Sequence, residues 1–218
     1  MIDVIQMFVQ PLFVDKLDVD NEKILEDLKK LDYFSIDNNK SIIKSYKSWN
    51  NCLLDEPEFK SLKHQIELMA NEINYTYSKF VEPLVLTESW ATKTEPGGIG
   101  DQHVHSNSLV SGVYYPKGTS TILFHNPKMS IDHNYTPTPQ FSDRNIYNSG
   151  DYTITPKDNF CLMFYSQTIH QLGYNNSKVD RYSIAFNTVV ATKGEYGLSK
   201  EQTESTNKRR KIVYGVWS

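Results

Sequence analysis

Two segments in the first third of the chain place apolar residues at helical spacing. The first, residues 21–31, begins beside Asp20 or Asn21, either of which can accept free backbone N–H groups as an N-cap. Its apolar positions are Ile24, Leu25, Leu28 and Leu31. The second begins with Asp55 and Glu58, a capping-box-like pair with Pro57 between them. Its apolar stripe runs through Phe59, Leu62, Ile66, Met69, Ile73 and Tyr77. The pattern predicts two amphipathic helices that pack on a sheet.

From residue 84 onward the pattern is typical of β-strands separated by Gly, Pro, Asn and Asp. The strand-like segments are LVLTESWAT, QHVHS, LVSGVYYP, TSTILFHN, DYTITP, NFCLMFYS, TIHQLGY and RYSIAFNTVV. Short strands after two helices predict a mainly β (α+β) fold, a double-sheet jelly roll with the helices packed on one sheet. Residues 4–14 predict an edge strand or an extended segment, and residues 33–54 a loop with short strands. IVYGVW near the end predicts an outer strand.

The length of 218 residues predicts a single domain. We expect a helical and extended N-terminal part over 1–83, a jelly-roll core over 84–190 and a C-terminal extension over 191–218. Residues 126–150 form a long polar stretch with three prolines. Polar stretches of this length in compact domains are often functional. We hypothesise that this one covers the mouth of the barrel and helps to select the substrate.

Charge and cysteine content narrow the function classes. A net charge of −3 gives no general attraction to nucleic acid or to anionic membranes, and KRRK at 208–211 is interpreted as a solvated tail or an ion-paired edge. No apolar stretch reaches the roughly 18 residues that a membrane span needs, and the N-terminus lacks the features of a secretion signal. Cys52 and Cys161 are typical of reduced thiols. We expect a soluble, cytoplasmic protein, and an exposed edge near its N-terminus would permit a homodimer.

Candidate metal chemistry lies in DQHVHSNSLVSGVYY, residues 101–115. His103 and His105 are two residues apart, so in a strand both imidazoles lie on one face, and Asp101 lies on the same face. Two imidazoles make half of a metal site, and His170 is the best candidate for the third ligand. Arg181 follows eleven positions after His170, with Ser183 two further on. The sequence contains no P-loop, zinc-finger spacing or Gly-x-Ser-x-Gly elbow.

This order of residues resembles the 2-oxoglutarate- and Fe(II)-dependent oxygenases. There His-x-Asp/Glu is followed by a distant His and, roughly ten residues later, by an Arg or Lys, often as Arg-x-Ser. In this chain His105 stands where the family has a carboxylate. HVHSNSLVSGVYY is also similar to a subgroup of oxygenases, many from bacteria and phages. The resemblance covers residues 90–190. It implies a double-stranded β-helix fold. It also implies a protein located in the cytoplasm of a bacterium or of a phage-infected cell.

The resemblance also implies the roles of the candidate residues. His103, His105 and His170 would hold Fe(II), with Asp101 as the alternative ligand. Arg181 suits the distal carboxylate of the cosubstrate 2-oxoglutarate, because a guanidinium offers two parallel charge-assisted hydrogen bonds, and Ser183 can add a third. Tyr114 and Tyr115 point to opposite faces of a strand, so only one of them can line the cavity and contact the cosubstrate. The third reactant is dioxygen.

The implied reaction is hydroxylation of an unidentified second substrate, coupled to decarboxylation of 2-oxoglutarate to succinate and CO₂. Two alternatives stay open. One is a cupin-like enzyme that binds Mn, Fe or Zn through the three histidines without 2-oxoglutarate. The other is a non-catalytic jelly-roll module, such as a binding or virion-associated protein. We expect the remaining candidate residues to have structural roles and not to bind a ligand. These are Trp90 in the core, Asn107 in a turn, and His64, His125 and His133 on the surface or in loops.

Overall fold

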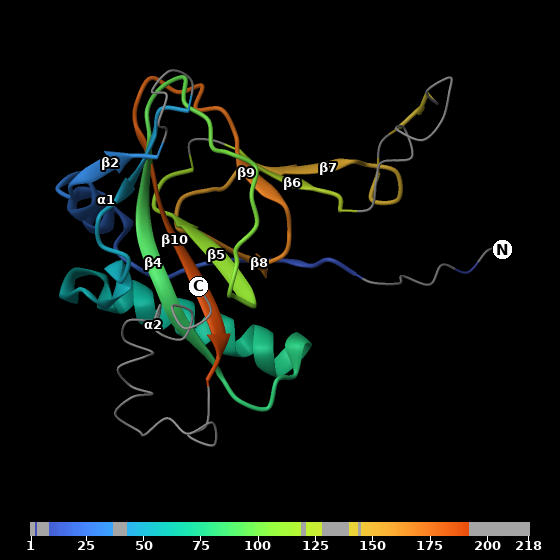
Figure 1. Cartoon of the computed structure of the whole chain (residues 1–218), viewed down its shortest axis with the longest axis horizontal. Helices are drawn as coiled ribbons and strands as arrows, with labels where there is room; N and C mark the ends of the chain where they lie inside the picture. Colours follow the sequence, from blue (N-terminus) through green and yellow to red (C-terminus); the bar gives the residue numbers. More distant parts are fainter. Residues whose placement is uncertain are drawn as a thin grey trace.

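The computed structural model describes residues 3, 9–36, 43–118, 121–127, 140–143 and 145–191 (Figure 1). Its strands are β1 (Leu12–Lys16), β2 (Tyr33–Ser35), β3 (Ser45–Ser48), β4 (Leu84–Thr94), β5 (Val110–Tyr115), β6 (Ile122–His125), β7 (Asp151–Ile154), β8 (Phe160–Tyr165), β9 (His170–Leu172) and β10 (Arg181–Val190). Its helical elements are α1 (Asn21–Lys29), the 3₁₀ turns η1 (Leu53–Asp55) and η2 (Pro57–Phe59), α2 (Lys60–Ile73) and the π-helical turn η3 (Asn74–Ser78).

Both helices form where the apolar spacing predicts them. At the start of α1, the Asp20 side chain accepts a hydrogen bond from the backbone N–H of Lys23 at 3.0 Å. The predicted capping box of α2 is wrong, because Asp55 ends η1 and its carboxylate binds the Lys63 amine at 2.9 Å instead. The apolar stripe of α2 also ends early. The wider turn of η3 leaves Tyr77 62% exposed, whereas Ile73 is buried.

The strands form two antiparallel sheets, which confirms the predicted jelly-roll fold. The large sheet has the order β1-β8-β5-β10-β4-β3-β2, and the small sheet has the order β7-β6-β9. β1 lies at an edge, as residues 4–14 predict, although the strand covers only the end of that segment. The QHVHS segment is not a regular strand. It makes a single antiparallel bridge, His103 to His170, which lays it beside β9.

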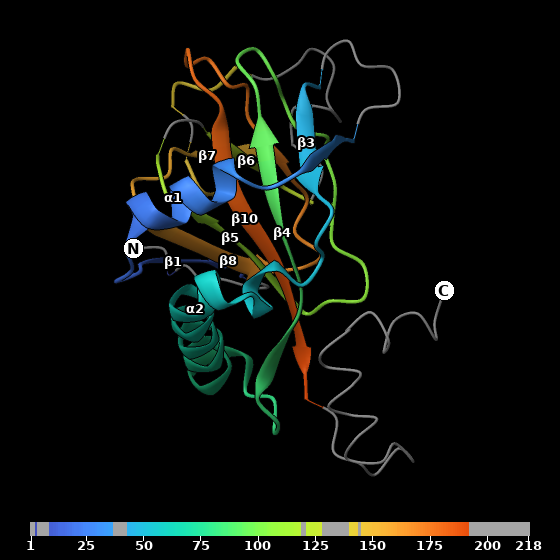
Figure 2. The same ribbon diagram turned by 90° about the vertical axis from the view of Figure 1, so that its left-hand side faces the viewer.

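The two faces of the large sheet bury different clusters. One face packs against α1 and α2, and its core includes Ala91, Tyr114 and Ile184 together with the apolar stripes of the helices. Figure 2 shows both helices on this side of the sheet. The other face turns toward the small sheet, and its cluster includes Tyr115 and Phe164. Because strand residues alternate between faces, even the neighbours Tyr114 and Tyr115 belong to different cores.

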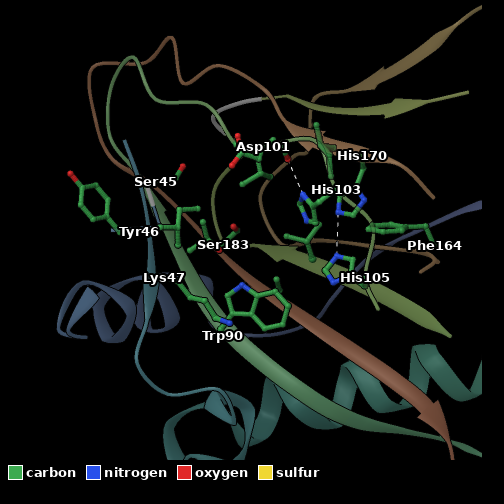
Figure 3. Close-up of a pocket in the computed structure, with 18 residues that line it drawn as sticks. Ser45, Tyr46, Lys47, Trp90, Asp101, His103, His105, Phe164, His170 and Ser183 are labelled. Atoms are coloured by element: carbon green, nitrogen blue, oxygen red, sulfur yellow. Dashed lines mark hydrogen bonds between the residues drawn. The ribbon is translucent and has the colours of Figure 1, made fainter. Parts of the chain in front are cut away.

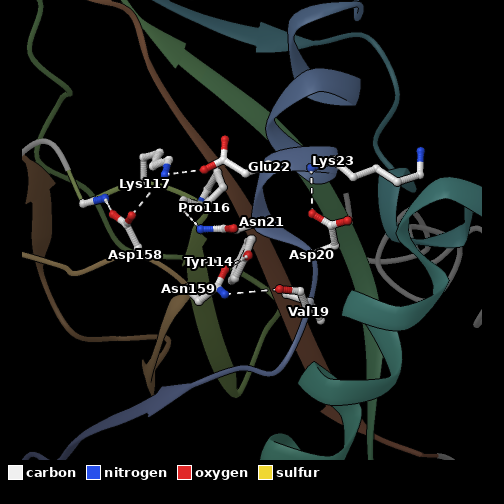
Figure 4. A network of polar contacts seen from close by, with 11 residues as sticks. Val19, Asp20, Asn21, Glu22, Lys23, Tyr114, Pro116, Lys117, Asp158 and Asn159 are labelled. Carbon is white, nitrogen blue, oxygen red and sulfur yellow. Dashed lines mark hydrogen bonds and ion pairs between the residues drawn. The ribbon is translucent and has the colours of Figure 1, made fainter.

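Asn159 ties the N-terminal segment to the large sheet (Figure 4). Its side-chain amide donates to the carbonyl oxygen of Val19 at 3.2 Å, and its side-chain oxygen accepts from the Tyr114 hydroxyl at 2.7 Å. Its backbone φ of 64° lies in the left-handed region, which Asn tolerates better than most residues. Nearby, the Lys117 amine bridges Glu22 of α1 and Asp158. These contacts hold α1 against the β5 and β8 ends.

Several predictions fall on residues that the structure does not describe. Residues 128–139 and 144 of the long polar stretch, the KRRK run and IVYGVW lie outside the described residues. The hypothesis for residues 126–150 and the division of the chain into three parts therefore stay predictions. None of the helices in the described part of the chain has the length and apolar character that a bilayer span requires.

We expect Asn159→Ala to lower the free energy of unfolding by about 2–4 kcal/mol. The change removes two hydrogen bonds, leaves the Tyr114 hydroxyl without its acceptor and places an alanine at positive φ. Urea unfolding of the variant, of Tyr114→Phe and of the double variant measures the coupling between the two residues. If the effects of the two single variants on the free energy of unfolding are additive in this double-mutant cycle, the Tyr114–Asn159 contact contributes nothing to stability.

Candidate metal and cosubstrate site

Three histidines from two distant parts of the chain meet between the sheets. His103 and His105 lie before β5, and His170 opens β9. One ring nitrogen from each lies within 4.8 Å of the others, and Figure 3 shows the rings facing one another. The Nε2 atoms of His105 and His170 are 3.2 Å apart. Two nitrogens bound at a right angle to one metal ion, at about 2.1 Å each, lie about 3.0 Å apart, so this spacing fits a shared ion.

Backbone carbonyls orient two of the rings. His103 Nδ1 donates to the carbonyl oxygen of Asp101 at 2.8 Å, and His170 Nδ1 donates to that of Thr168 at 2.9 Å. A carbonyl oxygen can only accept, so Nδ1 carries the proton and Nε2 presents its lone pair to the centre. Metal-binding histidines are usually held in this way. Asp101 lines the cavity but is not part of the three-histidine group, and its role as alternative ligand stays a prediction.

Burial keeps two of the imidazoles neutral. His105 is 8% exposed and His170 is 4% exposed. Burial, followed by the neighbouring His170, lowers the pKa of His105 to about 3. Burial also lowers the pKa of His170 to about 4, against the opposing effect of its hydrogen bond to Thr168. Since a metal binds the neutral imidazole, both side chains are in the ligating form at neutral pH.

The strand register brings the predicted anion-binding residues to the same side of the large sheet. Arg181 of β10 lies opposite Thr94 of β4, and Ser183 lies opposite Thr92. Side chains two residues apart share a face, so Arg181 and Ser183 both point toward the space between the sheets. Ser183 lines the cavity there. The predicted Arg-x-Ser pattern thus places both side chains on the inner face of β10.

Arg181 is 2% exposed, and two of its three nitrogens make hydrogen bonds among the described residues. Its Nη1 donates to the carbonyl oxygen of Gly173 at 3.1 Å, and its Nη2 donates to the Thr94 hydroxyl at 3.2 Å. Within the described residues its Nε and the hydroxyl of Tyr115 are buried without a hydrogen-bond partner. Asp180, the obvious partner in an ion pair, binds Lys93 at 3.2 Å. Unsatisfied buried donors are costly, so this corner fits an anionic ligand.

The structure distinguishes the two tyrosines. Tyr115 belongs to the inner cluster, and the positive charge of Arg181 acts on it against the effect of burial, which raises the Tyr115 pKa. Tyr114 belongs to the helix-facing cluster, and its hydroxyl binds Asn159. Only Tyr115 is therefore on the same side of the sheet as Arg181.

The histidines open onto a cavity of about 270 Å³. Its apolar wall includes Trp90, Val113, Ile122, Phe164 and Leu172. The expectation that Trp90 is a core residue is wrong: it is half-buried and lines the cavity, with its ring 5.9 Å from that of His105. Lys47 of β3 also lines the cavity. Residues 33–54 have no regular pattern, so nothing in the sequence indicates that Lys47 reaches the site.

The other conspicuous residues lie elsewhere. Asn107 sits in a turn with φ of 53°, and His64 is exposed on α2, as expected. His125 binds the Asp151 carboxylate at 2.7 Å and is not part of the histidine group. His133 lies outside the described residues.

Comparison with known proteins identifies the domain. Residues 88–187 match the model of a family described as “Putative 2OG-Fe(II) oxygenase”. These residues belong to the 2OG-Fe(II) oxygenase superfamily. The predicted superfamily is thereby confirmed. The prediction of an enzyme that uses Fe(II), 2-oxoglutarate and dioxygen is confirmed at the level of the superfamily. The narrower subgroup with Ser-Gly-Val-Tyr-Tyr stays a prediction.

Solved structures of 2OG-Fe(II) oxygenases share the fold at low identity. The alpha-ketoglutarate-dependent epimerase SnoN from nogalamycin biosynthesis has a TM-score of 0.61 and 13% identity, covering 84% of this chain and 80% of its own. HygX from Streptomyces hygroscopicus, with nickel, 2-oxoglutarate and hygromycin B bound, has a TM-score of 0.57 and 13% identity over 82% of each chain. A prolyl-4-hydroxylase from Pseudomonas putida has a TM-score of 0.55 and 11% identity, covering 83% and 94%. No curated protein matches the sequence.

We expect His170→Ala to lose stoichiometric Fe(II) binding. The change removes one of three converging nitrogens and leaves His103 and His105 without their partner. His125→Ala is the matched control, because this histidine lies outside the group. Metal content after anaerobic loading and desalting measures the difference. Full iron occupancy in His170→Ala would contradict this ligand set.

We also expect the metal-free protein to lose stability as the pH falls from about 6.5 to about 4. The unfolded chain takes up protons on His105 and His170 in this range, while the folded pKa values of about 3 and about 4 keep both rings neutral. The loss is on the order of a few kcal/mol, at about 1.4 kcal/mol per pH unit for each group. Urea unfolding with a chelator present measures it. His170→Gln should show a shallower dependence, and an unchanged slope would refute this assignment.

Proposed function

We propose that this 2OG-Fe(II) oxygenase hydroxylates a second substrate and releases succinate and CO₂. The observation that supports it best is the presence of two features on the inner side of the large sheet, the histidine group at the cavity and Arg181 two residues from the cavity-lining Ser183. Three imidazole nitrogens converge within 4.8 Å, and the buried Arg181 on the inner face of the sheet keeps one donor without a partner among the described residues. The first feature fits a metal ion, and the second fits a carboxylate.

In this proposal His103, His105 and His170 hold Fe(II). Three neutral imidazoles leave the ion's charge undiminished, whereas the usual two-histidine, one-carboxylate set reduces it. A dianionic 2-oxoglutarate offsets the difference, so the chain's departure from the family pattern favours tight binding of the cosubstrate. The carbonyl-anchored tautomers of His103 and His170 keep the ligating nitrogens pointed inward before the metal arrives.

The far carboxylate of 2-oxoglutarate would bind at the inner face of β10. Arg181 supplies its free Nε–H and its charge, Tyr115 supplies a hydroxyl that lacks an acceptor, and Ser183 supplies a second hydroxyl. Charge-assisted hydrogen bonds of this kind are stronger than neutral ones. Binding the anion would also relieve the cost of the two buried, unsatisfied donors.

When bound, Fe(II) and 2-oxoglutarate supply the oxygen chemistry, in which one atom of dioxygen enters succinate and the other enters the second substrate. The chain's own residues hold and orient these reactants. Trp90 and Phe164 form apolar walls beside the histidines and limit the access of water.

The free donors near Arg181 favour this proposal over a three-histidine cupin that does not use 2-oxoglutarate, because such an enzyme has no need for a buried anion site. They also argue against a non-catalytic module, because buried donors without a partner destabilise a core in which no ligand binds them. SnoN, described as an epimerase, shows that the same cosubstrate serves reactions other than hydroxylation. Incorporation of labelled oxygen into the product separates the two outcomes once a substrate is found.

Titration of the anaerobic Fe(II) protein with 2-oxoglutarate tests the proposal. We expect a visible charge-transfer band on binding, and succinate release after oxygen is admitted. Tyr115→Phe should weaken 2-oxoglutarate about 10- to 100-fold, as expected for a lost hydrogen bond to a charged group. Tyr114→Phe is the matched control and should stay within about twofold, because its hydroxyl faces the helices. Arg181→Lys should weaken binding as well, since lysine lacks the planar fork.

Absence of the band in the iron-loaded wild type would refute the proposed function. Equal effects of Tyr114→Phe and Tyr115→Phe would refute the assigned carboxylate site while leaving the metal site intact. The His170→Ala variant serves as the blank, because a band that persists without bound iron does not come from this site.

A further inference from the structure

Lys47 reaches the same cavity from β3, two strands away from β10 in the large sheet. It lies on β3 opposite Thr92 of β4, which in turn lies opposite Ser183 of β10. Side chains in such a row share a face, so Lys47 points toward the space between the sheets. Its amine stands 4.3 Å above the centre of the Trp90 ring, and Figure 3 shows the two side chains together below the histidines.

Lys47 carries a charge that no carboxylate of the described residues neutralises at close range. Within the described residues it makes no ion pair, whereas Lys93 on the neighbouring strand binds both Asp180 and Glu95. The Glu88 carboxylate acts on Lys47 only from a distance, and burial lowers the Lys47 pKa despite it. Among the described residues that line the cavity, Lys47 is the one lysine or arginine. The cavity therefore has a half-buried cation on an aromatic platform.

The position of this cation relative to the histidines sets what it can bind. The Lys47 amine is 4.3 Å from the Trp90 ring centre, and that ring is 5.9 Å from the ring of His105. A small organic molecule can span these two steps. Arg181 lies two strands away on β10, about 10 Å at the usual strand spacing. The two cations therefore offer separate positions for an anionic group, and the proposed function assigns 2-oxoglutarate to the position beside Arg181.

We propose that Lys47 recognises an anionic group, a carboxylate or a phosphate, on the second substrate. Trp90 forms the apolar floor beside that group, and the part of the substrate to be oxidised extends toward the histidines. The inference rests on the proposed function, because it assigns to the substrate the part of the cavity that the cosubstrate leaves free. A lysine that only covers the Trp90 ring would make the same cation–π contact but would bind no ligand.

The test uses small anions on the loaded enzyme. The protein, with Fe(II) and saturating 2-oxoglutarate under anaerobic conditions, is titrated with benzoate, phenyl phosphate and the neutral benzamide. Calorimetry and the shift of the charge-transfer band report binding. We expect the wild type to bind benzoate or phenyl phosphate at least tenfold more tightly than benzamide, and the better of the two anions identifies the group.

Three variants assign the effect. Lys47→Gln removes the charge and should abolish the preference for the anion over benzamide. Lys47→Arg keeps the charge and should retain most of it. Lys29→Gln is the matched control, because Lys29 is an exposed lysine on α1, away from the cavity. The dissociation constant of 2-oxoglutarate should be the same in Lys47→Gln as in the wild type.

Three results would overturn the inference. They are no anion preference in the wild type, an undiminished preference in Lys47→Gln, and a loss of 2-oxoglutarate affinity in that variant, which would assign Lys47 to the cosubstrate. A wild type that binds neither Fe(II) nor 2-oxoglutarate would instead refute the proposed function, and the inference with it. The initial titration with 2-oxoglutarate therefore separates the two failures.

Discussion

The site depends on one antiparallel bridge between segments far apart in the sequence. The backbone N–H of each of His103 and His170 donates to the carbonyl oxygen of the other, at 2.9 Å and 3.0 Å. This pair lays the irregular 101–105 segment along the edge of β9, and His105 adds a further backbone bond to Ser166 at 2.9 Å. Because both segments run extended, their side chains meet at fixed spacing. The convergence of the three imidazoles is therefore set by main-chain hydrogen bonding before any ligand is present.

The large sheet performs two tasks because its faces alternate. One set of side chains, including Tyr114 and Ile184, seals the contact with the helices. The other set places Arg181, Ser183 and Tyr115 toward the small sheet. The first set provides the hydrophobic burial that stabilises the domain. This stabilisation offsets the unfavourable free energy of the buried donors of Arg181 and Tyr115, which have no partner among the described residues. A shift of register by one residue would exchange the two sets and would lose both the core and the site.

The sequence predicted most of this arrangement, since helical and strand periodicity are local signals. It placed both helices, seven of the eight expected core strands and the residues that converge. It misjudged features that depend on tertiary contacts. Asp55 binds Lys63 instead of capping α2, Trp90 lines the cavity instead of the core, and QHVHS forms one bridge instead of a strand. Lys47 could not be found, because its segment has no periodicity and its position depends on pairing with β4.

The cavity is built from two separately anchored walls. The histidines come from β9 and the segment bridged to it, whereas Lys47 belongs to β3, a four-residue strand near the end of the large sheet. No side chain of β3 belongs to either of the buried apolar clusters. We therefore expect replacements of Lys47 to change the lining of the cavity while the three converging histidines keep their arrangement. Such modularity makes β3 a natural starting point for redirecting the catalyst toward different compounds.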